Sequence, residues 1–269
     1  MDTEVDPMSD VETGAAGAAP AHLAVFTDFD GTLVEIAERP EDVEVAPDLP
    51  ESIADAVEKL DSAFAVITGR EIDVIDHYLS PLHLPVAGAH GSQRRRADGA
   101  IEELDPEIVE AADALARRLE PLLADNLGLI VERKRGAVAL HYRQAPEFEQ
   151  ACKVAMREAA RFDDRFELVE GKMVIEARPR GLSKGTALRA FMREKPFAGR
   201  IPVFIGDDTT DEDAFIAAQE LGGVGIKLGA GPTAARMRIA DVASVHALIQ
   251  GLGDIAARAG RAAEQHPPA

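Results

Sequence analysis

Cysteine and long apolar runs are scarce in this chain of 269 residues, and tryptophan is absent. The single cysteine, Cys152, excludes an intrachain disulfide and fits a reducing compartment; we expect it to pack as a small residue on a helix. No apolar run approaches the length that spans a membrane, and residues 1–20 lack the basic and apolar regions of a signal peptide. We therefore expect a cytoplasmic protein whose residues 1–20 form a disordered acidic tail.

Basic residues are outnumbered, with 29 Lys and Arg against 48 Asp and Glu and a formal net charge of −19. Such a charge repels nucleic acids and anionic membranes, and we exclude both as partners. It also repels phosphorylated small molecules, so a site for one of them would need positive charge of its own. The acidic excess is compatible both with a halophilic adaptation and with an ordinary soluble acidic surface.

Short apolar runs alternate with helical patterns over much of the chain, and three of the runs end in polar loops. These three are residues 24–26, before Asp28; 64–67, before Thr68; and 203–205, before Gly206 and Asp207. Other strands are expected at 85–89 and 224–228, and helices at 53–60, 186–192 and 211–221, the last capped by Thr210 or Asp211. This alternation predicts an α/β fold, a Rossmann-like parallel sheet with helices on both faces, whose ligands bind at the carboxyl ends of the strands.

The middle of the chain has a different pattern, in which each of two helices is followed by a hairpin. The helices are expected at 106–119 and 147–162; the hairpins pair 129–131 with 138–142, and 166–169 with 173–177 through a turn at Glu170-Gly171. Back-to-back hairpins favour an antiparallel sheet. We therefore expect a catalytic core of 21–98 and 180–260, interrupted by an inserted α+β cap, 99–179, that confers substrate specificity. Arg94–Arg96 are expected to form a solvated connection into this cap rather than a nucleic-acid patch.

The sequence Asp-Phe-Asp-Gly-Thr-Leu at 28–33 places two carboxylates one residue apart directly after the first apolar run. One such carboxylate can attack phosphorus while its neighbour moves protons and Mg²⁺ offsets the crowded negative charge. The alternative is an Asp-rich turn, since Asp and Gly are ordinary turn residues. A second group of acids lies downstream and also has two interpretations. They could be partners of Asp28 in the site, or they could merely cap the N-terminus of a helix; the group comprises Asp207, Asp208, Asp211 and Asp213.

Six motifs together resemble the trehalose-6-phosphate phosphatases of the haloacid dehalogenase superfamily, and the resemblance runs from Leu23 to about Leu252. Three are typical of the superfamily: 28–33, Ser-Lys-Gly at 183–185, and Gly-Asp-Asp-Thr-Thr-Asp-Glu-Asp-Ala-Phe at 206–215. The others are Thr-Gly-Arg at 68–70, Gly-Ala-His-Gly at 88–91 and Gly-Lys-Met-Val-Ile-Glu-Ala-Arg-Pro at 171–179. The resemblance implies Mg²⁺-dependent hydrolysis of trehalose 6-phosphate to trehalose and phosphate through an aspartyl-phosphate, the last step of trehalose biosynthesis.

The same resemblance implies a role for each core residue. Asp28 would be the nucleophile, and Asp30 the general acid and base, kept protonated by the crowd of carboxylates around it. Thr68 and Lys184 would bind the phosphoryl oxygens. The metal ligands would be Asp28, the main-chain carbonyl of Asp30, and Asp207, with Asp208 and Asp211 in support.

Substrate recognition is implied at further residues: Gly69, Arg70 and His90 of the core, and Glu132, Lys134, Lys172 and Glu176 of the cap. The alternatives are that the cap residues are exposed hairpin charges and that His90 is a structural hydrogen-bonding group. The substrate is expected to be a small sugar phosphate, and a trehalose-phosphate synthase is a candidate partner. Phosphatases of sucrose phosphate or glycosyl-phosphoglycerate share this core chemistry and differ in the cap. A non-catalytic regulatory subunit would predict the loss of the nucleophile or the lysine, and both are present.

Overall fold

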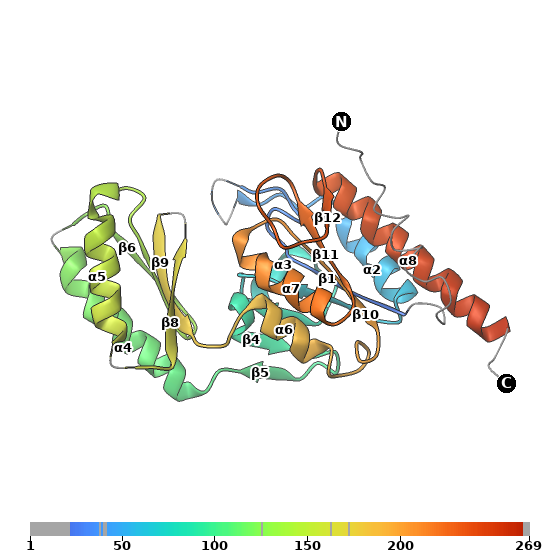
Figure 1. Ribbon diagram of the computed structural model, residues 1–269, viewed down its shortest axis with the longest axis horizontal. Helices are drawn as coiled ribbons and strands as arrows, with labels where there is room; N and C mark the ends of the chain where they lie inside the picture. Colours follow the sequence, from blue (N-terminus) through green and yellow to red (C-terminus); the bar gives the residue numbers. More distant parts are fainter. Residues whose placement is uncertain are drawn as a thin grey trace. The chain divides into compact units, whose positions relative to one another are not determined.

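The computed structural model describes residues 22–37, 39, 42–124, 126–161, 163–171 and 173–265. The expected tail, residues 1–20, lies outside the described residues. The chain divides into two compact units: a core unit that ends at Ile101 and resumes at Ser183, and an inserted unit over Glu102–Leu182 (Figure 1). The sequence had placed these two boundaries at 98/99 and 179/180.

Eight strands of the described residues form one sheet in the order β12-β11-β10-β1-β2-β3-β4-β5. They are β1 (Leu23–Thr27), β2 (Phe64–Ile67), β3 (Val86–Gly88), β4 (Gln93–Arg95), β5 (Ile101–Glu103), β10 (Ile201–Gly206), β11 (Val224–Leu228) and β12 (Met237–Ile239). The neighbours from β12 to β3 pair in parallel, whereas β4 runs antiparallel to β3. β1 therefore lies between β10 and β2, and the carboxyl ends of these three strands meet at one edge.

Helices cover both faces of this sheet because strand side chains alternate between two hydrophobic cores. In β1, Leu23 and Val25 belong to one core, and Ala24 and Phe26 to the other. The first core contains side chains of α2 (Leu49–Lys59), α3 (Ile72–Tyr78) and α8 (Val242–Gln265); the second contains those of α6 (Lys184–Phe191) and α7 (Glu212–Glu220). This arrangement confirms the predicted α/β core with helices on both faces of a parallel sheet.

A cluster of three phenylalanine rings holds α6 against the centre of the sheet. The ring of Phe197 lies 5.2 Å, centroid to centroid, from both Phe26 of β1 and Phe191 of α6. Removing a buried ring of this kind costs about 3–5 kcal/mol of stability. Because Lys184 is the first residue of α6, this packing fixes where that lysine stands relative to the end of β1.

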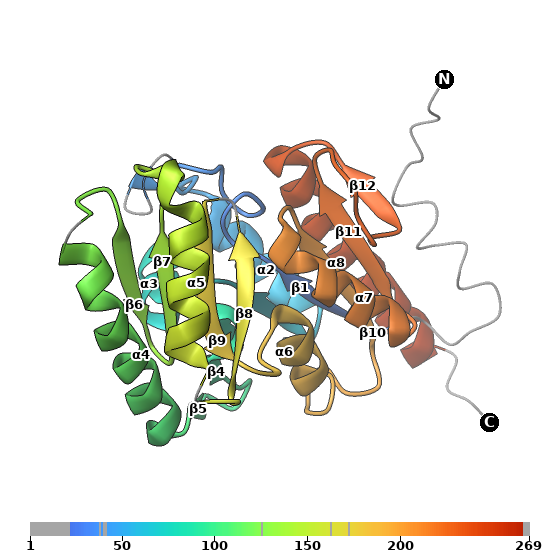
Figure 2. The same cartoon turned by 60° about the vertical axis from the view of Figure 1, so that its left-hand side comes forward.

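The inserted unit is a four-stranded antiparallel sheet with two helices on one face (Figure 2). Its elements are α4 (Pro106–Ala124), β6 (Ile130–Lys134), β7 (Ala137–His141), α5 (Glu149–Ala160), β8 (Phe166–Gly171) and β9 (Val174–Pro179). The strand order is β6-β7-β9-β8, which agrees with the predicted helix–hairpin pairs. Cys152 of α5 is fully buried in the core of this unit, as expected. Within the described part of the chain, no helix of either unit is long and apolar enough to cross a membrane.

The prediction of a turn at Glu170-Gly171 is wrong. Both residues continue β8, where Glu170 pairs with Ile175 and Gly171 with Val174. Met173, between the paired residues Gly171 and Val174, adopts a positive φ of 63° instead. A Cβ atom on Gly171 would lie 2.8 Å from a methyl group of Val174, so a larger residue there would require that side chain to move.

The prediction of a solvated connection at Arg94–Arg96 is wrong for Arg94 and Arg95, whereas the Arg96 side chain is 38% exposed. Arg95 is only 8% exposed, and its guanidinium donates two hydrogen bonds of 2.6 and 2.7 Å to the carboxylate of Asp76 in α3. Arg94 lies over the ring of Phe191 and pairs with Glu194 at 2.9 Å. A run of arginines can pack inside when carboxylates and aromatic rings accept each guanidinium.

Candidate active site

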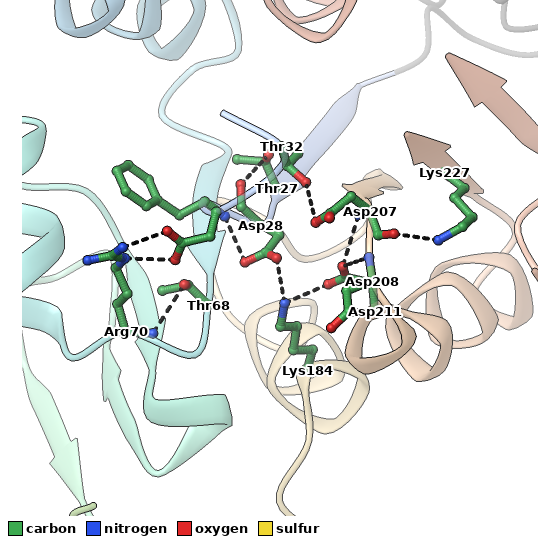
Figure 3. Close-up of polar contacts among 12 residues, drawn as sticks. Thr27, Asp28, Thr32, Thr68, Arg70, Lys184, Asp207, Asp208, Asp211 and Lys227 are labelled. Atoms are coloured by element: carbon green, nitrogen blue, oxygen red, sulfur yellow. Dashed lines mark hydrogen bonds and ion pairs between the residues drawn. The ribbon is translucent and has the colours of Figure 1, made fainter. Parts of the chain in front are cut away.

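The carboxyl ends of β1, β2 and β10 bring together the residues expected to carry the chemistry (Figure 3). Asp28 follows β1, Thr68 follows β2 and Asp207 follows β10. The Asp28 N–H donates to the carbonyl of Ile205, so β10 fixes the backbone of Asp28 directly. Thr68 is fully buried, and its hydroxyl oxygen accepts the main-chain N–H of Arg70 at 3.2 Å. Gly69 lies between them in the same loop.

Asp28 and Lys184 form a buried ion pair at the centre of the site. Asp28 is 5% exposed and Lys184 is 2% exposed, and the lysine Nζ lies 2.8 Å from Asp28 Oδ2. The other Asp28 oxygen accepts the N–H of Phe29 at 2.7 Å. Lys184 occupies its place because α6 begins there, with the Ser183 hydroxyl accepting the N–H of Thr186 in a capping box.

Burial changes the proton affinity of both members of this pair. Desolvation raises the pKa of Asp28 to about 7, against the lowering effect of Lys184 and together with repulsion from Asp211. Burial alone would lower the pKa of Lys184, but the carboxylates of Asp28 and Asp211 raise it above its usual range. Lys184 therefore keeps its positive charge, whereas Asp28 resists ionisation beside the carboxylate of Asp211.

Asp211 holds the loop that follows β10. Its side chain is fully buried, with Oδ1 at 2.7 Å from Lys184 Nζ and Oδ2 accepting the N–H groups of Asp207 and Asp208, each at 3.0 Å. Asp208 caps the short helix Thr209–Asp211, and Asp211 is the N-cap residue of α7. The helix-capping role and the partnership with the Asp28 site, considered above as alternatives, are therefore both present.

Three carboxylates lie close enough to hold a metal ion: one oxygen each from Asp28, Asp207 and Asp211 lies within 4.8 Å of the others. Carboxylate oxygens are hard ligands that suit a cation such as Mg²⁺. Burial, followed by repulsion from Asp211, raises the pKa of Asp207 to about 6, so a cation would relieve a crowded set of charges. Asp211 is fully buried and already accepts hydrogen bonds from Lys184 and from the N–H groups of Asp207 and Asp208, which suits a supporting role.

Gly31 and Thr32 shape the space around the Asp207 carboxylate. Gly31 has a positive φ of 73°, and a Cβ atom on it would lie 2.4 Å from Asp207 Oδ2. Only glycine therefore fits between the first aspartate loop and Asp207. The Thr32 hydroxyl donates to Asp207 Oδ1 at 3.3 Å, a contact that the sequence analysis missed although Thr32 lies within the first motif.

Asp30 does not lie among the other carboxylates, which corrects the expectation that their crowding keeps it protonated. Its two oxygens accept hydrogen bonds of 2.7 Å from Arg70 Nε and Nη2. The Arg70 guanidinium in turn lies over the rings of Phe29 and Tyr78, at 5.7 and 5.3 Å from their centroids. Arg70, which was expected to bind substrate, therefore pairs with Asp30 in this structure.

Glu132, Lys134 and Glu176 lie on one face of the sheet of the inserted unit. Glu132 and Glu176 flank Ala139 in register, and Lys134 lies 3.3 Å from Glu176. Glu132 Oε2 lies 2.8 Å from Nε2 of His141, a neighbour that the sequence analysis did not single out. Of the remaining predicted residues, Lys172 and the side chain of His90 lie outside the described residues.

The raised pKa of Asp28 predicts how the stability of the metal-free protein depends on pH. The folded-state pKa of about 7 exceeds the ordinary value of 3.8, so the folded state binds the proton more tightly than the unfolded chain. This stabilising contribution is fully present below about pH 4 and is lost as the pH rises through about 7. We expect urea unfolding in chelator to give a lower free energy of unfolding at about pH 8 than at about pH 5.

Asp28→Asn is the matched control, since it removes the titrating group with little change of shape. The loss of unfolding free energy between the two pH values should be smaller in this variant than in the unaltered protein, because the variant retains only the contributions of the other acids. Equal losses in both proteins would show that Asp28 titrates normally.

A solved phosphatase of the haloalkanoate (HAD) superfamily from Bacteroides thetaiotaomicron shares this fold, with a TM-score of 0.60 at 15% identity, over 95% of this chain and 99% of that one. The model of the trehalose-phosphatase family matches residues 26–243. A trehalose-6-phosphate phosphatase of Escherichia coli is 41% identical over 229 residues, which cover 84% of each chain. A probable trehalose-phosphate phosphatase of Sinorhizobium fredii is 40% identical over 231 residues, again 84% of each chain. The crystal structure of a trehalose-6-phosphate phosphatase related protein superimposes with a TM-score of 0.71 at 29% identity, over 88% of this chain and 99% of that one. The chain belongs to the trehalose-phosphatase family.

Proposed function

We propose that this chain is a Mg²⁺-dependent phosphatase that hydrolyses trehalose 6-phosphate to trehalose and phosphate in the cytoplasm, as the last step of trehalose biosynthesis. A trehalose-phosphate synthase would supply its substrate and is a candidate partner. The observation that carries the proposal is the buried Asp28–Lys184 pair beside Asp207 and Asp211. It combines a nucleophile, a fixed positive charge and carboxylates for a metal in a chain whose relatives are named for this substrate.

The proposed reaction has two displacements at phosphorus. In the first, an oxygen of Asp28 bonds to phosphorus and the bond to the sugar oxygen breaks, while Asp30 gives that oxygen a proton. In the second, a water molecule bonds to phosphorus, the bond to Asp28 breaks, and Asp30 accepts a proton from the water. The enzyme is thereby restored, and phosphate is released.

Lys184 and Thr68 would stabilise the charge on the transferring group. Lys184 already faces the nucleophile at 2.8 Å, so its ammonium can oppose the repulsion between Asp28 and an incoming phosphate. The Thr68 hydroxyl, together with the loop N–H groups that follow it, would donate to the phosphoryl oxygens. Arg70 is also proposed to bind the substrate. It would release Asp30 when it does so, because one guanidinium cannot donate the same N–H groups to the carboxylate and to the substrate.

The metal would be held by the side chains of Asp28 and Asp207 and by the main-chain carbonyl of Asp30, with Asp208 and Asp211 in support. When bound, Mg²⁺ would neutralise part of the charge shared by the carboxylates and the phosphate. The raised pKa values of Asp28 and Asp207 support this assignment, since a cation favours the ionised form of both groups.

Substrate choice is proposed to lie with Glu132, Lys134 and Glu176, whose charged groups can bind sugar hydroxyls. Changing each to Ala is expected to lower kcat/KM for trehalose 6-phosphate roughly 10- to 100-fold, because a hydrogen bond to a charged group contributes about 1.5–3 kcal/mol. Both kcat and KM should change, since binding energy far from phosphorus also orients the reacting groups. The slow hydrolysis of an aryl phosphate, which has no sugar hydroxyls, should change little.

Glu158→Ala is the matched control for these variants, because Glu158 is an exposed acid of the same unit that pairs only with Arg161 among the described contacts. It should leave the hydrolysis of both substrates unchanged. Equal losses on the two substrates in the Glu132, Lys134 and Glu176 variants, or no loss on either, would show that these residues do not select the sugar.

The proposed function is tested by phosphate release from a panel of trehalose 6-phosphate, sucrose 6-phosphate and glucose 6-phosphate, assayed with Mg²⁺. We expect the highest kcat/KM for trehalose 6-phosphate. A clear preference for another sugar phosphate would reassign the substrate and leave the core chemistry in place. No hydrolysis of any phosphate ester by correctly folded protein would favour a non-catalytic regulatory role.

A further inference from the structure

Lys227 is a buried cation near the site that the proposed mechanism does not use. It lies in β11, between the apolar residues Ile226 and Leu228, and is 5% exposed. Its Nζ donates a hydrogen bond of 2.5 Å to the main-chain carbonyl oxygen of Asp207. Among the described residues, no carboxylate forms an ion pair with it.

A buried ammonium group without a carboxylate partner is unfavourable for stability. Removing such a group from water costs several kcal/mol unless ion pairs and hydrogen bonds compensate. The chain has 48 acidic residues, so a partner for a structural lysine is not hard to provide. In the part of the chain that the structure describes, the carbonyl of Asp207 is the one group to which the Lys227 side chain donates a hydrogen bond, so the placement of this lysine indicates a role at Asp207.

Asp207 needs such a contact because it is the first residue beyond the end of β10. The last residue of that strand, Gly206, pairs in register with Lys227 itself, so the carbonyl of Asp207 has left the ladder between the strands. The Lys227 side chain reaches this carbonyl from the adjacent strand. In Figure 3, it approaches Asp207 from the side opposite Asp28 and Lys184.

Three side chains together hold every polar part of Asp207 except one oxygen. Its N–H donates to Asp211 Oδ2 at 3.0 Å, its carbonyl accepts from Lys227, and its Oδ1 accepts from the Thr32 hydroxyl at 3.3 Å. The remaining oxygen, Oδ2, lies beside Gly31. Fixing both the N–H and the carbonyl sets the rotation of the backbone, and with it the direction in which the carboxylate points.

We propose that Lys227 is a positioning residue that holds the peptide of Asp207 so that its carboxylate faces Asp28 and can bind the metal. This inference rests on the metal role given to Asp207 in the proposed function. A residue can be important for metal binding without touching the metal, when it orients a metal ligand. Loss of such a residue typically weakens metal affinity or activity about 10- to 100-fold. The hydrogen bond to the carbonyl, rather than the charge by itself, carries the effect, because a bare cation there would repel Mg²⁺.

The test measures Mg²⁺ binding to the full chain without substrate by isothermal titration calorimetry, as the Mg²⁺ concentration that half-saturates the site. Lys227→Met, which cannot donate, should raise this concentration about 10- to 100-fold. Lys227→Gln, whose side chain is too short to reach the carbonyl, should raise it too. Lys227→Arg, which is long enough to donate, should stay closer to the unaltered protein than either of these variants.

Arg95→Met is the matched control, because Arg95 is another buried cation of the core unit and contacts Asp76 and Leu84 rather than the site. It should lower the melting temperature in chelator without changing the Mg²⁺ midpoint. Should Lys227→Met not fold, the Gln variant decides the question.

A midpoint in Lys227→Met or Lys227→Gln equal to that of the unaltered protein would refute the positioning role. If the unaltered protein still hydrolysed trehalose 6-phosphate with Mg²⁺, the proposed function would stand even though the positioning role of Lys227 had been refuted. Failure of the unaltered protein to respond to Mg²⁺ would refute both the metal assignment and the role of Lys227.

Discussion

Asp28→Asn is expected to abolish turnover of trehalose 6-phosphate while leaving the substrate able to bind. The amide is nearly isosteric with the carboxylate, but it is a poor nucleophile, so no bond to phosphorus can form. Asn can still accept the N–H of Phe29 through its oxygen, which keeps the loop in place. The measurement is phosphate release by the purified variant, with calorimetric titration to determine the affinity for trehalose 6-phosphate.

Asp98→Asn is a matched control, since Asp98 is an exposed acid of the same unit, at 60% side-chain exposure, and lies away from the site. It should keep full activity. Contaminating phosphatase is excluded when a parallel purification from the same host without this protein shows no activity. Substantial turnover by Asp28→Asn would then contradict the assignment of the nucleophile.

Removal of the metal is expected to abolish activity as completely as loss of the nucleophile. Without a cation, Asp28 and Asp207 resist ionisation, and a protonated Asp28 is a poor nucleophile. Where they do ionise, their charges add to that of the substrate's phosphate, and Lys184 alone cannot neutralise all of them. Phosphate release should fall to background in chelator and return with added Mg²⁺. Ca²⁺ should inhibit, because its larger and looser coordination shell would misplace the nucleophile.

The control for this experiment is the folded state of the chelated protein, followed by circular dichroism, because a loss of fold would also remove activity. Full activity in excess chelator, after dialysis against metal-free buffer, would show that the acidic cluster does not depend on a cation for catalysis.

The meeting of Asp28, Thr68 and Asp207 at one edge could be predicted because each residue follows an apolar run that forms a parallel strand. Parallel strands place their carboxyl ends together, so position in the chain is enough to bring these side chains close. The contact of Lys184 with Asp211 could not be derived in this way. It depends on how α6 and α7 pack side by side, which is set by the buried side chains of both helices.

The environment of Asp30 shows why neighbours in sequence need not share surroundings. Asp28 and Asp30 are two residues apart, yet Asp30 pairs with Arg70. Asp28 points to Lys184 instead (Figure 3). The resemblance implied a shared cluster of acids, but the chain turns from Phe29, whose carbonyl accepts the N–H groups of Leu33 and Val34, and the carboxylate of Asp30 pairs with Arg70 of the β2 loop.

Short strands and buried charged residues were the other features that could not be predicted from the pattern of the sequence. β4, β5 and β12 have three residues each, too few for alternation to be recognised. Arg95 and Lys227 are buried although their residue types are usually exposed, and only the positions of their partners explain this. A lysine inside the apolar run of β11 is the one signal in the sequence that could have drawn attention to Lys227.

The most direct test of the covalent mechanism at Asp28 uses Asp30→Asn and an aryl phosphate, whose leaving group needs no proton. The first displacement should then be fast, and the second slow, because no group remains to activate the water, a loss of roughly 10²- to 10⁴-fold. Rapid quenching should show a burst of one phenol per enzyme, slower release of phosphate, and a phosphoryl group on Asp28 by mass spectrometry. Phenol and phosphate released in step, with no phosphoryl group on Asp28 at any time, would contradict the mechanism.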